Sequence, residues 1–191
     1  MEELQDNELI RHYLEGDESA FEVLYQRYRT RLFGYLSGLL PYQPAEAEDI
    51  YQQTWIKVIA QLPKYQDQGC FAAWLFRIGR NLLIDQIRHQ KRQPQMQEID
   101  REDMPEISAP PGAEPWRGMD EAELGSMIHQ SLETLTQEQK EVFLLRQAGI
   151  PFKEIARLQQ CSLNTALARM QYALKKMKKQ LLSIDQGGLI Q

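Results

Sequence analysis

The sequence predicts an all-α protein with two small helical domains joined by a flexible acidic linker. Apolar residues recur at steps of three and four over long stretches, and no stretch shows the apolar–polar alternation of a strand. One proline-rich, acidic segment interrupts this helical periodicity. With 191 residues, the chain has room for one large or two small domains. We expect helical domains over 1–93 and 122–183, a linker over 94–121 and a tail over 184–191.

Composition excludes several classes of protein. No run of about 18 apolar residues is present, so no membrane insertion is expected. The acidic N-terminus lacks the apolar segment of a secretory signal, which predicts a cytoplasmic protein. Cys70 and Cys161 fall in different predicted domains without a CxxC or histidine–cysteine cluster, which indicates neither disulfides nor a metal site. Enzyme motifs are also missing. We therefore predict a protein that is not an enzyme and has no cofactor and no small-molecule substrate.

Charge is distributed unevenly along the chain. The net charge of -5 disfavours a free-standing, tight DNA-binding protein, because such proteins carry a basic surplus. Residues 1–93 contain 11 basic and 13 acidic residues, residues 94–122 contain 2 and 8, and residues 123–191 contain 9 and 6. The acidity therefore lies mostly in the linker, and the C-terminal module is basic.

The first two helices are marked by their ends. A short helix over 6–16 ends at Gly16, and Asp17 is a favourable N-cap for a second helix over 18–40. A continuous apolar stripe along the second helix is formed by Phe21, Leu24, Tyr28, Leu32, Tyr35 and Leu39.

A third helix, expected over 45–62, has two different faces. The apolar face should pack into the bundle and comprises Tyr51, Trp55, Val58, Ile59 and Leu62. The opposite face carries Asp49, Gln52, Gln53 and Ile56. From spacing alone, a solvated surface is the simpler interpretation of that second face.

A polar loop over 65–70 leads into a fourth helix over 71–90. Its buried stripe is expected to comprise Phe71, Trp74, Leu75, Ile78 and Leu82. The opposite side comprises Arg77, Arg80, Asn81, Ile84 and Arg88, extended by His89, Lys91 and Arg92. Cations beside aromatic residues suit single-stranded or melted nucleic acid, because they neutralise phosphates while the rings stack on bases. On its own, a solvated helix face explains the pattern as well.

The periodicity stops at Pro94, and Trp116 is the residue of the acidic linker best suited to bind a partner. A helix over 121–135 then leads into the C-terminal module. Thr136 and Gln139 there have the spacing of a capping box, which starts the next helix.

The remaining residues have the pattern of a helix-turn-helix. A glycine and a proline end the capped helix, and a short helix follows with Ile155, Ala156 and Leu158 on its apolar side. After a tight turn, Ser162 can cap a longer helix. The expected buried face of that helix comprises Leu163, Ala166, Leu167, Met170, Leu174 and Met177. The opposite face, which could contact bases and phosphates, comprises Asn164, Thr165, Ala168, Arg169, Tyr172, Lys175 and Lys176. An ordinary helical hairpin with a solvated basic end is the alternative.

Two segments together resemble a known family. The chain contains, in this order, DIYQQTWIKVIAQLPKY, FAAWLFRIGRNLLIDQIRHQKR, an acidic linker, and LTQEQKEVFLLRQAG followed by EIA and NTALARM. This arrangement is similar to bacterial RNA polymerase sigma factors of the sigma-70 family. More narrowly, it resembles the extracytoplasmic-function (ECF) group, which keeps two domains and a linker. The resemblance covers about residues 6–93 and 122–182.

The resemblance implies a role for each face. The family binds the clamp region of the polymerase beta-prime subunit through positions that match Asp49, Gln52, Gln53 and Ile56. Contacts with the −10 promoter element are implied for Tyr65, Asp67, Phe71, Arg77, Arg80, Asn81 and Arg88. Contacts with the −35 element are implied for Lys153, Ser162, Asn164, Thr165, Ala168, Arg169, Tyr172, Lys175 and Lys176. The implied partners are core RNA polymerase, promoter DNA and an anti-sigma factor.

Two positions depart from the family pattern. Leu167 stands where the family usually has a basic residue that touches DNA, and Gln160 stands where the turn often has glycine. We therefore expect an unusual −35 preference. The alternatives to a sigma factor are a stand-alone helix-turn-helix regulator and a protein that sequesters another regulator.

Overall fold

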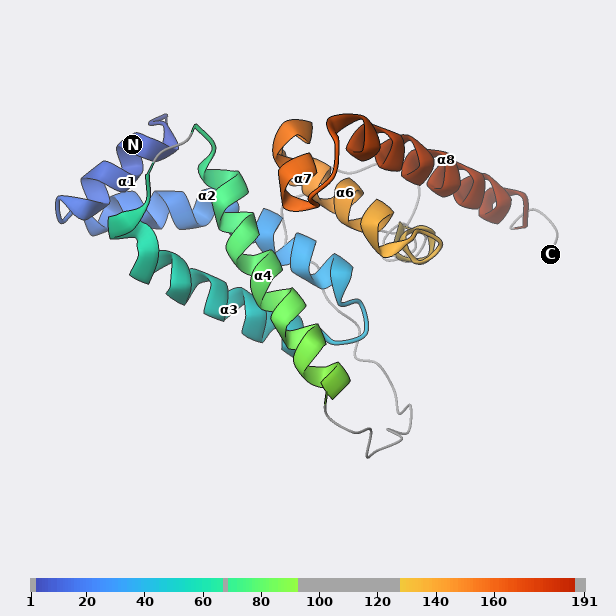
Figure 1. Ribbon diagram of the computed structural model, residues 1–191, viewed down its shortest axis with the longest axis horizontal. Coiled ribbons are helices and arrows are strands. Elements are labelled where there is room, and N and C mark those ends of the chain that lie inside the picture. The colour runs from blue at the N-terminus through green and yellow to red at the C-terminus, as the bar shows by residue number, and fades with distance from the viewer. Residues whose placement is uncertain (1–2, 67–68, 93–127, 188–191) are drawn as a thin grey trace.

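The computed structural model describes residues 3–66, 69–92 and 128–187, and every regular element in them is helical, as predicted. The predicted linker, Trp116 and Asp67 lie outside these residues. The N-terminal bundle comprises α1 (Asp6–Leu14), α2 (Glu18–Leu39), α3 (Pro44–Gln61), the short 3-10 helix η1 (Leu62–Lys64) and α4 (Phe71–Arg92). The C-terminal bundle comprises a helical segment over 128–133, α6 (Gln137–Gln147), α7 (Phe152–Leu158) and α8 (Leu163–Gly187) (Figure 1).

Helix ends in the N-terminal bundle follow the sequence signals. Gly16 has a φ of 103°, a conformation that glycine adopts without strain, and it separates α1 from α2. The Asp17 carboxylate accepts a hydrogen bond of 3.0 Å from the backbone N–H of Ser19, which confirms the predicted N-cap. These local interactions set the direction in which α2 leaves the first turn.

The centre of the N-terminal bundle is α2, which contacts α1, α3 and α4. The predicted stripe of α2 is buried along most of its length, and Leu24 and Leu32 are fully buried. On α4 the buried side is wider than predicted, because it also includes Phe76, whose ring centroid lies 5.3 Å from that of Tyr35. A helix covered on two sides buries a broader arc than a single stripe.

The C-terminal bundle confirms the predicted helix-turn-helix. Thr136 and Gln139 form a capping box at the start of α6. Gly149, with a φ of 85°, lets the chain turn after α6. Ser162 then accepts a 3.1 Å hydrogen bond from the backbone N–H of Thr165 at the start of α8. The helix extends to Gly187, so part of the predicted tail is helical.

The two bundles are in direct contact. Helix α6 packs against α2, and α7 packs against α4, an arrangement that Figure 1 shows. Leu145 and Ile155 of the C-terminal bundle belong to the same buried cluster as Leu36 and Phe76. The bundles therefore share one continuous hydrophobic core in this conformation, which nothing in the sequence predicted.

One residue of the predicted α3 stripe is misplaced. Ile59 was expected to be buried, but its side chain is 42% exposed. The helix packs into the bundle through Ile50, Trp55 and Val58. Because successive residues are about 100° apart around a helix, Ile59 lies beyond the edge of that contact.

Candidate nucleic-acid and protein interfaces

The exposed side of α3, which we call the α3 surface, comprises Asp49, Gln52, Gln53, Ile56 and Ile59. Gln53 donates a 2.7 Å hydrogen bond to Asp49, four residues away. Ile56 is 66% exposed beside these polar groups. Exposed isoleucines with adjacent hydrogen-bonding side chains have the composition of a protein-binding surface, where apolar residues are surrounded by polar ones. The sequence identified four of these residues and missed Ile59.

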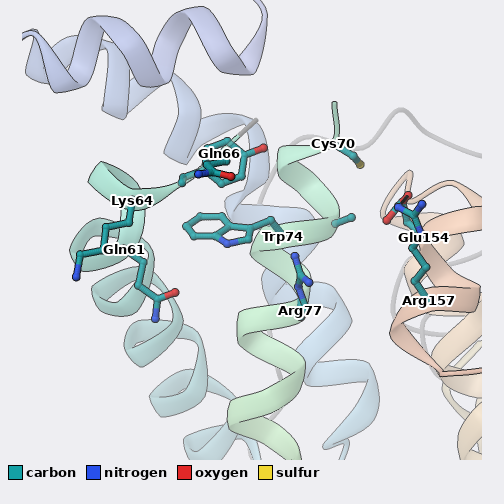
Figure 2. Close-up of a pocket in the computed structure, with 10 residues that line it drawn as sticks. Gln61, Lys64, Gln66, Cys70, Trp74, Arg77, Glu154 and Arg157 are labelled. Atoms are coloured by element: carbon teal, nitrogen blue, oxygen red, sulfur yellow. Dashed lines mark hydrogen bonds and ion pairs between the residues drawn. The ribbon is translucent and has the colours of Figure 1, made fainter. Parts of the chain in front are cut away.

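A pocket of about 400 Å³ opens beside the start of α4. Residues of the N-terminal bundle form most of its wall, and Glu154 and Arg157 of α7 complete it. In Figure 2 these two α7 side chains lie across from Cys70, Trp74 and Arg77. Cations, amides and an indole therefore line a single cavity between the bundles.

Three aromatic residues in mutual tilted or edge-on contact lie at this pocket. The ring centroids of Tyr65 and Trp74 are 4.7 Å apart, and those of Phe71 and Trp74 are 5.5 Å apart. Phe71 is buried, so it supports the other rings and does not face solvent. Tyr65 and Trp74 line the pocket, where their faces can stack on an unpaired base. Trp74 was predicted to be buried; its half-exposed position makes it an addition to the predicted site.

The residues on the basic side of α4 differ in their exposure to solvent. Arg77 and Asn81 are exposed, and Arg88 is exposed beside Asp85 at 3.9 Å. Such a surface ion pair leaves the guanidinium available to a phosphate. Arg80 is different, because it is half-buried and paired with a carboxylate of the C-terminal bundle.

Helix α8 presents polar residues at its exposed start. Asn164 and Thr165 are exposed in the first turn, and Lys153 is exposed on α7. Further along α8, the predicted face continues with exposed Tyr172, Lys175 and Lys176. Exposed amide and hydroxyl groups near the start of such a helix suit base edges, and the later cations suit phosphates.

Ala168 and Arg169 are less accessible than predicted. Both are half-buried, and Arg169 donates a 2.7 Å hydrogen bond to the side chain of Gln159. The reason is that α8 is rotated relative to the sequence prediction. Ala166, Ala173 and Met177 form its buried side.

The same rotation exposes leucines that were predicted to be buried. Leu163, Leu167 and Leu174 are 47%, 37% and 49% exposed. The prediction assumed that the larger apolar residues face the core. Small residues occupy the contact instead, because α8 approaches its neighbours closely at Ala166 and Ala173.

A buried acidic residue, Glu141 of α6, was missed by the sequence interpretation. Its Oε1 accepts from Arg80 at 2.7 Å and from the Tyr35 hydroxyl at 3.2 Å. Its Oε2 accepts from Gln159 at 2.8 Å. A signal was present, since Glu141 lies four residues before the buried Leu145 and therefore on the same side of α6.

Tyr35 titrates abnormally in this cluster. Burial of its ring, followed by the negative charge of Glu141, raises the pKa of Tyr35 well above its ordinary value. The phenol therefore stays neutral and continues to donate to Glu141 at physiological pH.

Two searches of the described residues gave negative results. Across 3–66, 69–92 and 128–187 no group of three or more histidine, cysteine or acidic residues could hold a metal ion. None of the helices in those ranges is long and apolar enough to cross a membrane.

The fold and these surfaces define a class: a two-bundle helical protein with a helix-turn-helix, a second aromatic and cationic surface, and a helix that exposes isoleucines beside polar side chains. Residues 24–93 match the family model of sigma-70 region 2, and residues 126–177 match that of sigma-70 region 4. The chain belongs to the sigma-70 family, and within it to the ECF group. It is thus an alternative sigma factor that directs transcription initiation. The match of residues 24–93 to region 2 argues against the alternative of a stand-alone helix-turn-helix regulator.

Similar proteins span nearly the whole chain. The RNA polymerase sigma-H factor of Pseudomonas aeruginosa is 25% identical over 182 residues, covering 93% of this chain and 94% of the relative. The ECF RNA polymerase sigma-E factor of Escherichia coli strain K12 is 26% identical over 179 residues, covering 88% and 90%.

Solved structures share the fold. The sigma factor RpoE in complex with the anti-sigma factor NepR from Bartonella quintana has a TM-score of 0.65 at 22% identity, covering 84% of this chain and 96% of that one. CnrH in complex with the cytosolic domain of CnrY has a TM-score of 0.64 at 22% identity, covering 94% and 98%.

Proposed function

We propose that the α3 surface binds the beta-prime clamp of core RNA polymerase. The observation that carries this assignment is the pair of exposed isoleucines beside Asp49, Gln52 and Gln53, within the segment that matches region 2. The apolar centre supplies burial on binding, and the carboxylate and amides supply directional hydrogen bonds at its edge.

Recognition of the −10 element is assigned to the aromatic pocket and the adjacent side of α4. A base that leaves the stack must recover a few kcal/mol through stacking and hydrogen bonds. Trp74 and Tyr65 offer stacking faces, and Arg77 and Asn81 are exposed beside them. Asp67, Phe71, Arg80 and Arg88 complete the proposed −10 set.

Recognition of the −35 element is assigned to the helix-turn-helix. Ser162, Asn164 and Thr165 lie at the exposed start of α8, where a recognition helix meets base edges. The proposed set also includes Lys153, Ala168, Arg169, Tyr172, Lys175 and Lys176. In this division of labour, 1–93 and 122–183 are the two functional domains.

The remaining assignments follow from the family. The protein acts as a dissociable, non-catalytic subunit in the cytoplasm, and an anti-sigma factor is its expected inhibitor. The anti-sigma assignment is supported by the two solved structures of similar fold: one holds the sigma factor RpoE in complex with the anti-sigma factor NepR, and the other holds CnrH in complex with the cytosolic domain of CnrY.

Transcription with purified core RNA polymerase tests the proposed function. The protein is added to core enzyme with a promoter library, and transcripts are mapped by sequencing. We expect initiation at a small promoter set that core enzyme alone does not use. Failure to bind core enzyme, together with failure to initiate at any promoter, would overturn the proposal.

A further inference from the structure

The start of α8 exposes two leucines that are not part of its buried side. Leu163 and Leu167 are 47% and 37% exposed, whereas the small residues Ala166 and Ala173 are fully buried against the rest of the bundle. Single exposed leucines are common on protein surfaces, so exposure alone assigns them no role. Their position is informative, because the first turns of a recognition helix are the part that enters the major groove of DNA.

The two leucines lie beside side chains that suit an A·T base pair. Asn164 and Gln171 are exposed, and because they are seven residues apart they lie on the same side of α8, next to the leucines. The amide of asparagine or glutamine forms a bidentate pair with adenine N6 and N7, and an apolar side chain contacts the C5-methyl group of thymine. Amides and leucines on one exposed surface therefore match both members of the same base pair.

The same turns lack the side chains that recognise a G·C base pair. Arginine or lysine binds guanine at O6 and N7, and aspartate or glutamate accepts from the cytosine amine. From Ser162 to Leu174, a stretch that the structure describes in full, there is no acid and Arg169 is the one basic residue. Arg169 is half-buried, and its guanidinium donates a 2.7 Å hydrogen bond to Gln159. Direct contacts from the start of α8 therefore favour A·T over G·C pairs.

The cations of α8 are concentrated further along the helix. Lys175, Lys176, Lys178 and Lys179 are all exposed beyond its third turn. They suit phosphates and not bases, because the beginning of a recognition helix is the part that reaches base edges. Four ammonium groups on the helix that carries the leucines favour a polyanion over an apolar protein as the partner of this surface.

The spacing of the leucines predicts which methyl groups they reach. Leu163 and Leu167 are four residues apart, which is about 6 Å along the helix axis. Successive bases of one strand are about 3.4 Å apart along the duplex. The two side chains can therefore contact methyl groups that are about two base-pair steps apart.

We propose that Leu163 and Leu167 recognise the −35 element through thymine methyl groups, so that this element is rich in A·T pairs. The inference rests on the proposed function, which takes α8 as the −35 recognition helix, and adds the base that the helix selects. Neither leucine belongs to the −35 set assigned above. The contact removes apolar surface of both partners from water, which favours thymine over a base without a C5-methyl group.

The first test changes the DNA and leaves the protein intact. Duplexes that bind the full-length protein at low salt are selected from a random library, and the tightest is resynthesised with deoxyuridine in place of each thymine in turn. Deoxyuridine pairs with adenine but lacks the C5-methyl group. Fluorescence anisotropy should show roughly three- to fivefold weaker binding at two thymines, about two steps apart. A selected duplex rich in G·C pairs, or equal affinity for thymine and deoxyuridine at every position, would overturn the proposal.

The second test assigns the methyl dependence to the leucines. Leu163→Ala and Leu167→Ala are compared with Leu174→Ala, the same change at a side chain that is 49% exposed in a later turn of α8. Each of the first two variants should bind thymine and deoxyuridine duplexes equally at one of the two positions, because the partner of that methyl group is lost. Leu174→Ala should retain the wild-type preference at both positions. Retention of both preferences by Leu163→Ala and by Leu167→Ala would overturn the assignment.

The outcomes separate this inference from the proposed function. Leucine-dependent recognition of the methyl groups, without transcription from any promoter, establishes the inference for α8 and overturns the proposed function alone. Transcription from promoters whose −35 elements bind equally well with thymine and with deoxyuridine overturns the inference alone. The inference is also overturned if no duplex is selected by the protein, either alone or bound to core polymerase.

Discussion

The Nε of Arg80 lies 2.7 Å from Oε1 of Glu141, although 61 positions separate these residues and they belong to different bundles. Arg80 was predicted to face melted DNA, yet the structure places it against an acid of the helix-turn-helix bundle. A basic residue that is proposed to contact nucleic acid thus has an internal partner in this structure. This relationship makes the surroundings of Glu141 the most informative region for mutation.

The buried phenol beside this pair predicts an alkaline instability. The folded-state pKa of Tyr35 is raised above its unfolded value of about 10, so its contribution is complete below pH 10 and is lost as pH rises further. Tyr35→Phe should lower the free energy of unfolding by about 1 kcal/mol at neutral pH through the lost hydrogen bond. That deficit should shrink as pH rises above about 10, because the variant has no phenol to ionise at this position. Urea unfolding at several pH values measures it.

The control for this experiment is Tyr172→Phe, on an exposed residue. Its profile should follow that of the wild-type protein. A constant difference between Tyr35→Phe and wild type across the pH range would contradict the assignment.

The α3 surface predicts a selective defect in polymerase binding. Asp49→Ala combined with Gln53→Ala removes a hydrogen-bonded acid–amide pair and should weaken core binding about tenfold, because the directional hydrogen bonds that these side chains offer to the partner are lost. Glu22→Ala with Gln26→Ala removes an equivalent 2.7 Å pair from α2 and serves as the matched control. Fluorescence titration with core polymerase measures both, and circular dichroism checks helicity. Equal affinity of the two double variants would contradict the assignment of this surface.

Leu167 predicts how DNA affinity can be increased. Its side chain is 37% exposed on the recognition helix, so Leu167→Arg adds a cation with little loss of packing. Duplex binding should tighten roughly fivefold, and the slope of log affinity against log salt should become steeper by about one phosphate contact. Leu14→Arg makes the same change on exposed α1 and should leave the slope unaltered. A slope that is unchanged in Leu167→Arg would place this residue away from the DNA.

Replacement of Gln160 by glycine is expected to increase the stability of the folded protein. It has a φ of 52°, the left-handed conformation that L-residues other than glycine adopt at a penalty. Gln160→Gly should raise the free energy of unfolding by about 1 kcal/mol. Gln171→Gly, the same change at an exposed position inside α8, should lower it by about the same amount. Thermal unfolding distinguishes the two, and a loss of stability in Gln160→Gly would contradict the strain argument.

Sequence reasoning succeeded where a structure depends on residues close together in the chain. The cap at Asp17, the capping box at Thr136 and the turn at Gly149 depend on side chains and backbone within about one helical turn. The exposed polar side of α3 was also predictable, because helical spacing places its members together.

The errors came from residues whose burial depends on what packs against them. The α8 leucines were assigned to the core because they are large and apolar, whereas Ala166 and Ala173 form the actual contact. Ile59 and Trp74 lie at the edges of their stripes, where a small rotation of the helix changes exposure. Periodicity specifies a face to within about one residue, and neighbouring helices decide the rest.

The sequence by itself determined the helices, their caps, the helix-turn-helix and the sigma-70 resemblance, because these depend on local spacing and on motifs. Tertiary structure alone decided that the bundles share a core, that Leu144 packs against Gly38, and that Arg80 donates a hydrogen bond to Glu141. Those contacts join residues about a hundred and about sixty positions apart, and no local propensity encodes which buried acid meets which cation. Only the packing of α6 and α7 against α2 and α4 brings them together.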